Sequence, residues 1–238
     1  MIRHFAGALA AATLVLLAGC DSLPGKPTPE ERYVRPEQVT DFATLWGQNC
    51  SGCHGADGRL GPARPLNDPL YLALADDADL IRVTSQGVAG TTMPAFALSA
   101  GGTLTDTQIA ALVREMRARW ARPAEVAGVS LPPYAAPPGD AQRGAATYAK
   151  ACAPCHGADG VGVAGKAKGS IVDGSYLALV SDQGLRTTVI AGRSDLGMPD
   201  FRGDAGGAPL TATQVADVVA WLAAQRPQFP GRPYPETK

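Results

Sequence analysis

The chain has 238 residues, of which 45% are hydrophobic and 18% are charged, and its formal net charge is -1. Because 21 basic side chains balance 22 acidic ones, the composition lacks the basic excess typical of nucleic-acid-binding proteins. With three histidines and five cysteines, the chain is also poorly supplied with the free bases and thiols that enzymes use in catalysis.

The N-terminus has the pattern of an export signal. A short positive leader precedes an apolar run over residues 5–18, which is shorter than the roughly twenty residues of a membrane-spanning helix. The run ends in the letters LAGC, which resemble the bacterial lipobox, where cleavage before the cysteine exposes it for acylation. We therefore expect a lipoprotein signal peptide over residues 1–19 and lipidation of Cys20, the alternative being an ordinary signal peptide followed by a cysteine. Asp21 implies retention at the inner membrane by the enteric sorting rule.

The rest of the chain contains two copies of one block, separated by proline-rich stretches. Nine residues that begin at Cys50 return at Cys152 with two changes, and Met93-Pro94 returns at Met198-Pro199. The order of the matches is kept and their spacing drifts only from 102 to 106 residues, which indicates duplication of a whole domain. The predicted boundaries are a tether at 20–40, domain one at 41–121, a linker at 122–139, domain two at 140–226 and a tail at 227–238.

Helical periodicity recurs in both blocks. We expect a helix from about Asp41 to the first motif cysteine, and another after Thr105, which has the side chain of an N-cap. The matching helices of domain two are expected after Asp140 and Thr211. Alternating apolar and polar runs typical of strands are nearly absent, so the predicted fold class is all-α, with two tandem small helical domains.

Each block contains the sequence Cys-x-x-Cys-His once. The residues are Cys50, Cys53 and His54 in the first block and Cys152, Cys155 and His156 in the second. Two cysteines on one side of a helical turn can add to the two vinyl groups on one edge of a porphyrin, and the adjoining histidine then reaches the iron. The sequence thus predicts two covalently bound c-type haems as cofactors.

Two other interpretations of these cysteines are less favoured. A structural zinc site could use all four, but the cysteine pairs of such sites usually lie much closer together in sequence. A thioredoxin-like redox pair requires a βαβ setting, which the pattern lacks.

The second axial ligand of each iron is expected to be a methionine. Met93 and Met198 lie 39 and 42 residues after the motif histidines, in loop sequence, and each precedes a proline that restricts the backbone. Met116 instead falls on the apolar stripe of a predicted helix, where methionine usually fills a core. We therefore predict the axial pairs His54/Met93 and His156/Met198.

Each block resembles a class I c-type cytochrome domain, over about residues 40–120 and 140–226. The resemblance implies helices wrapped around each haem, with the first and last helices of the domain crossing. In that family a glycine and an aromatic residue pack at the crossing, and Gly144 and Tyr148 match them in domain two. Domain one has Phe42 and Trp46 instead, so we expect a wider or shifted crossing there.

The resemblance also implies a proline after the motif, whose neighbouring carbonyl orients the histidine. Gly61-Pro62 is the candidate in domain one. Domain two has Gly165-Lys166-Ala167-Lys168 and no proline nearby, so the partner of His156 is left open.

Two protein ligands on each iron leave no vacancy for a small-molecule substrate, and a thioether sulfur favours the ferrous state. We therefore expect an electron-transfer protein and not an enzyme. It would carry single electrons between protein redox partners on the periplasmic face of the inner membrane, held there by its lipid anchor. A fixed subunit of a larger membrane oxidoreductase complex is the main alternative. A di-haem enzyme of peroxidase type is less favoured, because the mature chain keeps no free histidine for acid–base catalysis.

Overall fold

The computed structural model describes residues 25, 27–28, 31–164, 169–203 and 208–227. The predicted signal peptide over 1–19, Cys20 and most of the tail lie outside these ranges. The chain divides into two units between Gln38 and Val39. In the described part of the first unit, Pro36–Gln38 form a single 3-10 turn. No helix among the described residues combines the length and the apolar character needed to cross a bilayer.

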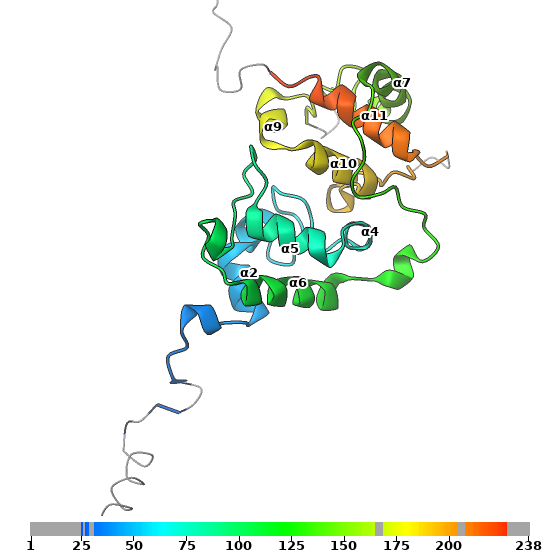
Figure 1. Cartoon of the computed structure of the whole chain (residues 1–238). Coiled ribbons are helices and arrows are strands. Elements are labelled where there is room, and N and C mark those ends of the chain that lie inside the picture. The colour runs from blue at the N-terminus through cyan, green and yellow to red at the C-terminus, as the bar shows by residue number, and fades with distance from the viewer. Residues whose placement is uncertain (1–24, 26, 29–30, 165–168, 204–207, 228–238) are drawn as a thin grey trace, which may run out of the picture. The chain divides into compact units, whose positions relative to one another are not determined.

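The second unit is helical, and no β-strand occurs among its described residues, which confirms the predicted all-α class. The first half contains α2 (Phe42–Asn49), α3 (Ser51–His54), α4 (Pro69–Leu74), α5 (Asp77–Gln86) and α6 (Asp106–Trp120). The second half contains α7 (Ala141–Ala151), α8 (Ala153–His156), α9 (Gly174–Leu179), α10 (Asp182–Ala191) and α11 (Ala212–Ala223). Short 3-10 turns occupy Leu98–Ala100, Pro123–Val126 and Ser194–Leu196. Figure 1 shows these helices along the chain.

The starts of the long helices are set by local side-chain caps. Asp41 accepts a hydrogen bond from the amide of Thr44 at 2.8 Å, and Asp140 caps α7 in the same way. Thr105 and Thr211 each form a capping box with the glutamine three residues later. The four predicted helix starts are therefore confirmed.

In domain two, α7 and α11 cross at close range (Figure 1). A Cβ atom at Gly144 would stand 2.0 Å from the carbonyl oxygen of Asp217, so only glycine allows the two backbones to approach this closely. Tyr148 stacks on Trp221 beside the crossing, with ring centroids 4.0 Å apart. These contacts agree with the crossing predicted from Gly144 and Tyr148.

In domain one, large rings fill the corresponding space. Phe42 stands where domain two has Gly144, and it lies 5.7 Å from the ring of Trp46. Trp120, the last residue of α6, meets both rings edge-on at 5.6 and 4.8 Å. Edge-to-face packing of this kind adds to the burial energy of the rings. The contact between α2 and α6 is thus made by aromatic side chains and not by a glycine.

Hydrogen bonds between two loops join the two halves of the second unit, in addition to the contact between α4 and α10. The amide of Leu60, a residue with φ of 61°, donates to Asp195 at 3.1 Å, and Arg193 donates to the carbonyl of Gly61 at 3.2 Å. The hydroxyl of Ser194 donates to Asp68 at 3.2 Å. We call this contact the junction; it joins the loop after the first motif to the loop that precedes Met198.

Candidate functional site

Both Cys-x-x-Cys-His motifs form one short helical turn that ends at the histidine. The first helix of each domain leads directly into this turn, α2 into α3 and α7 into α8. Gly55 and Gly157 follow the histidines with φ of 85° and 81°. A Cβ atom at position 55 would lie 1.8 Å from the carbonyl oxygen of Arg59, so glycine is required for the chain to leave the turn in this direction.

An aromatic side chain anchors each turn from the preceding helix. In domain one, Nε1 of Trp46 donates to the carbonyl of Gly55 at 3.1 Å. In domain two, the hydroxyl of Tyr148 donates to the carbonyl of Gly157 at 2.7 Å. The sequence comparison placed Trp46 and Tyr148 at equivalent positions but did not reveal this shared role. A tryptophan in one domain and a tyrosine in the other therefore donate to equivalent backbone carbonyls.

His54 is oriented by a backbone carbonyl in the loop after the motif. Its Nδ1 lies 2.7 Å from the carbonyl oxygen of Arg64, which can only accept, so Nδ1 carries the proton and Nε2 keeps its lone pair. Burial lowers the pKa of His54, which favours the neutral imidazole that a metal ligand requires, and the hydrogen bond to Arg64 partly opposes this shift. The carbonyl belongs to the residue before Pro65, so the assignment of this role to Gly61-Pro62 was wrong.

The motif cysteines form no disulfides. Cys50 and Cys152 are partly buried, whereas Cys53 and Cys155 are exposed. Burial, with a smaller contribution from the neighbouring motif cysteine, raises the pKa of Cys50 and of Cys152 to about 11. A thiol with so high a pKa is protonated at neutral pH, which does not suit a nucleophilic or dithiol redox role for the unmodified chain.

The second motif repeats the first up to its histidine. His156 ends α8, and its carbonyl accepts from the amide of Gly162 at 2.9 Å. Residues 165–168, where the notable difference from domain one begins, lie outside the described part of the chain.

The two predicted methionine ligands occupy matching loops. Val88 donates its amide to the carbonyl of Met93 at 3.0 Å, and Arg193 pairs with Met198 through two backbone hydrogen bonds of 3.0 and 3.1 Å. A Cβ atom at the preceding glycine, Gly87 or Gly192, would lie 2.7 or 2.6 Å from the methionine carbonyl. Each Met-Pro segment is thus held close to the end of a helix. Met116 is buried in the core, as expected of a packing residue.

A family model described as cytochrome c oxidase, cbb3-type, subunit III, matches residues 37–114 and again residues 139–222, together more than half of the chain. The chain belongs to this family. It therefore contains two tandem cytochrome c domains and is a haem-binding protein of the electron-transfer class.

One solved structure, a chain of the Kuenenia stuttgartiensis reducing HAO-like protein complex, has 19% sequence identity and a TM-score of 0.45. The similarity covers 82% of this chain and 100% of that chain. No curated protein matches the chain.

The residues of the first cytochrome c domain fit a covalent haem. Two thiols without disulfides stand three positions apart on one helical turn, and the adjoining imidazole has its second nitrogen available. Nη1 of Arg64, close to this histidine in the chain, is buried and has no hydrogen-bond partner among the described residues. A buried cationic donor of this kind is suited to a negatively charged group.

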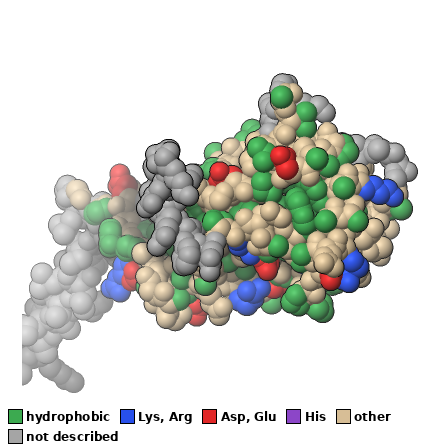
Figure 2. All heavy atoms as spheres, turned by 90° about the horizontal axis from the view of Figure 1, so that it is seen from above, with side chains coloured by type: hydrophobic (Ala, Val, Ile, Leu, Met, Phe, Trp, Pro, Cys, Tyr) green, Lys and Arg blue, Asp and Glu red, His purple; other side chains and the backbone are tan. Residues whose placement is uncertain are grey.

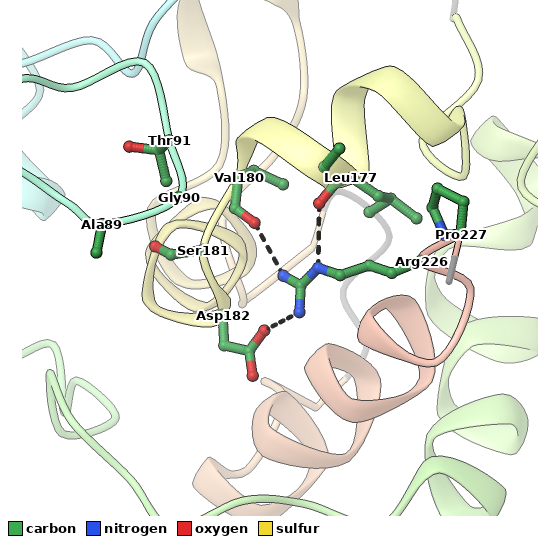
Figure 3. Close-up of a pocket in the computed structure, with 10 residues that line it drawn as sticks. Ala89, Gly90, Thr91, Leu177, Val180, Ser181, Asp182, Arg226 and Pro227 are labelled. Atoms are coloured by element: carbon green, nitrogen blue, oxygen red, sulfur yellow. Dashed lines mark hydrogen bonds and ion pairs between the residues drawn. The ribbon is translucent and has the colours of Figure 1, made fainter. Parts of the chain in front are cut away.

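Figure 3 shows a separate hollow between the loop at Gly90 and α9. Arg226 lines it, but the guanidinium already has hydrogen-bond partners within the protein. It donates to the carbonyls of Leu177 and Val180 at 3.0 and 2.8 Å and to Asp182 at 2.5 Å. None of the predicted haem-attachment or axial residues lines the hollow, so we assign it a structural role: Arg226 ties the chain beyond α11 to the start of α10.

Proposed function

We propose that this protein is a membrane-tethered di-haem c-type cytochrome that carries single electrons between protein partners on the periplasmic face of the bacterial inner membrane. Cys50 and Cys53, and likewise Cys152 and Cys155, would attach the two haems. The axial pairs would be His54/Met93 and His156/Met198.

The observation that supports this proposal most is the repetition of one attachment turn. Both copies end at a histidine, continue through a glycine with positive φ and are anchored by an aromatic donor on the preceding helix. A motif that occurred by chance would not repeat these three supports in a second domain.

The described residues would act by holding the haem ligands in fixed positions. The carbonyl of Arg64 keeps the ring of His54 in one tautomer and orientation. Backbone hydrogen bonds hold Met93 to Val88 and Met198 to Arg193. A c-type haem bound in this way supplies an iron that changes its charge by one electron. With a histidine and a methionine held in place on each iron, little rearrangement would accompany that change, and small-molecule substrates would be excluded from the iron.

The membrane tether is the part of the proposal that rests on sequence. Cys20 would carry the lipid, and the proline-rich residues 20–40 would connect it to the cytochrome c domains. Cys20→Ser should release the protein from the membrane fraction without changing its haem content. A variant that stays in the membrane fraction would argue against lipidation.

The family description favours a second candidate, because it names a subunit of a terminal oxidase. In that case the protein would perform the same electron transfer within a permanent complex. Gentle solubilisation of membranes distinguishes the two candidates: a fixed subunit co-purifies with stoichiometric partners, whereas a free carrier does not.

The experiment that tests the proposal is haem analysis of the purified full-length chain. We expect two covalently bound haems per chain by pyridine haemochrome assay after denaturation. We also expect no spectral change when cyanide or carbon monoxide is added at neutral pH. A chain without covalent haem would overturn the proposal, and ready ligand binding would favour an enzyme of peroxidase type.

A further inference from the structure

Arg64 occupies an unusual position at the junction. Its backbone carbonyl orients His54, while its guanidinium reaches domain two, where Nη2 donates to the hydroxyl of Thr188 on α10 at 2.7 Å. One residue therefore connects the predicted haem ligand of domain one with a helix of domain two.

No carboxylate among the described residues forms an ion pair with the guanidinium of Arg64, although the charge of Asp68 acts on it from a longer distance. The guanidinium carbon lies 4.8 Å from the centre of the Tyr71 ring, and no ion pair to Arg64 occurs in the described ranges. Nη1 is buried without a hydrogen-bond partner there. Burial lowers the pKa of Arg64, and the charges of Tyr71 and Asp68 only partly oppose this shift.

The hydrogen-bonding atoms of the charged groups around Arg64 are used elsewhere, although Asp68 keeps its negative charge. Both oxygens of Asp68 are used, one by the amide of Tyr71 at 2.8 Å and the other by Ser194 at 3.2 Å. Arg193 forms a two-pronged ion pair with Asp195 at 2.9 and 3.0 Å, so its charge is already balanced. Among these groups, Nη1 of Arg64 is the donor without a hydrogen-bond partner in the described part of the chain, so it is available to an anion.

Arg186 provides a useful comparison. Its Nη1 is also buried without a partner among the described residues. However, Nε and Nη2 of Arg186 donate to the carbonyls of Pro133 and Tyr134 in the linker, at 2.7 to 3.2 Å. Arg186 thus connects α10 to the linker, whereas the guanidinium of Arg64 contacts the hydroxyl of Thr188 and the ring of Tyr71 among the described residues.

We propose that Arg64 holds a carboxylate at the junction, and that this carboxylate is a propionate of one of the two haems. The proposal rests on the proposed function, because it requires bound haem. A propionate is an anion that the holoprotein always carries, and a guanidinium binds carboxylates with more than one hydrogen bond. Arg64 is then a positioning residue for the haem, and it would keep a positive charge close to the iron.

The test compares variants of the full-length holoprotein. Arg64→Gln removes the charge, Arg64→Lys keeps the charge but loses the planar donor pair, and Arg82→Gln is the matched control. Arg82 lies on α5, is half-exposed and pairs with Asp79. Haem content is measured first by pyridine haemochrome assay; resonance Raman then reports hydrogen bonding to the propionates, and a redox titration gives both midpoint potentials.

We expect Arg64→Gln to shift the propionate bending band and to lower one midpoint potential, since a lost positive charge favours the ferric state. Arg64→Lys should shift the band and leave the potentials near those of the wild type. Arg82→Gln should change neither. The centre whose potential falls identifies the haem whose propionate is bound.

Each contrary result has its own meaning. If Arg64→Gln takes up two haems and keeps the wild-type band and potentials, the inference about Arg64 fails and the proposed function stands. If Arg64→Gln does not take up haem, an unshifted band in Arg64→Lys overturns the inference. A wild-type potential that changes when phosphate replaces chloride at constant ionic strength would assign the site to a free anion. A wild-type chain without haem would overturn the proposed function itself.

Discussion

Gly144 on α7 lies directly against the backbone of Asp217 on α11, so close that a Cβ atom would stand 2.0 Å from the carbonyl oxygen. The side chain of the same aspartate is also buried at this crossing, with 3% of the residue exposed. It accepts hydrogen bonds from the amide of Asp140 at 2.7 Å and from two nitrogens of Arg143 at 2.8 Å. Both the backbone and the side chain of Asp217 therefore fasten the first helix of domain two to the last.

Gly144→Ala should destabilise domain two by about 1–3 kcal/mol, because the helices must separate to admit a methyl group against backbone. Thermal unfolding followed by circular dichroism would measure the effect. Gly47→Ala on α2 is the control: its Cβ would meet nothing within 4 Å, and a gain of about 0.5–1 kcal/mol is expected from helix propensity. Equal stability of Gly144→Ala and the wild type would contradict the close crossing.

The stability of domain two should depend on pH through Asp217. Hydrogen bonds from Arg143 and from the amide of Asp140 hold the pKa of Asp217 below its ordinary value. The stabilisation is present above the unfolded pKa of about 3.9 and is lost as the pH falls through the lower folded value.

Asp217→Asn should therefore be less stable than the wild type at pH 7, and the difference should shrink on acidification. Urea unfolding between pH 3 and pH 7 would show it. The control is Asp182→Asn. The carboxylate of Asp182 is largely exposed, and this change removes its ion pair with Arg226. A constant difference between Asp217→Asn and the wild type across this range would refute the assignment.

Tyr148→Phe should cost about 1 kcal/mol, since it removes the hydrogen bond to Gly157 while the stacking on Trp221 is kept. Tyr33→Phe, at a residue 81% exposed, should have no measurable effect. Chemical denaturation of the two variants side by side gives the comparison. If Tyr148→Phe unfolds at the wild-type denaturant concentration, the hydroxyl does not anchor the attachment turn.

Met93→Ala and Met198→Ala should each abolish the methionine-to-iron absorption band of one haem and lower its midpoint potential, because a soft sulfur ligand is lost. Met116→Leu should leave both unchanged and cost less than about 1.5 kcal/mol, as expected for a volume-conserving change in a core. Absorption spectra of the oxidised proteins and redox titrations measure these effects. Retention of both bands in Met198→Ala would remove that residue from the ligand set.

The features predicted correctly from sequence are those decided locally. Asp41 and Thr211 cap helices through residues only three positions away, so the pattern of letters contains all the necessary information. The packing role of Met116 also follows from helical spacing alone.

The features that were missed depend on how distant segments meet. Pro62 and Pro65 were both available after the first motif, and only the folded loop shows that the carbonyl before Pro65 faces His54. The pairing of Arg143 with Asp217 spans 74 residues, and that of Leu60 with Asp195 spans 135. Sequence spacing cannot reveal such contacts, because they depend on the packing of whole helices.

The surfaces that face outward are of mixed charge on the side shown in Figure 2, where basic and acidic side chains are interspersed. Two arginines near the end of α6 contact other parts of domain one: Arg117 donates to the carbonyls of Leu72 and Ala75, and Arg119 lies over the ring of Phe42. These arginines thus have structural roles in domain one.

The junction also makes the duplicated pair asymmetric. Domain one contributes the loop that follows its histidine, and domain two contributes the loop that leads to its methionine. A symmetric contact would bury the equivalent surface in both copies. Here each copy buries a different side, so the surface left for protein partners differs between the two domains.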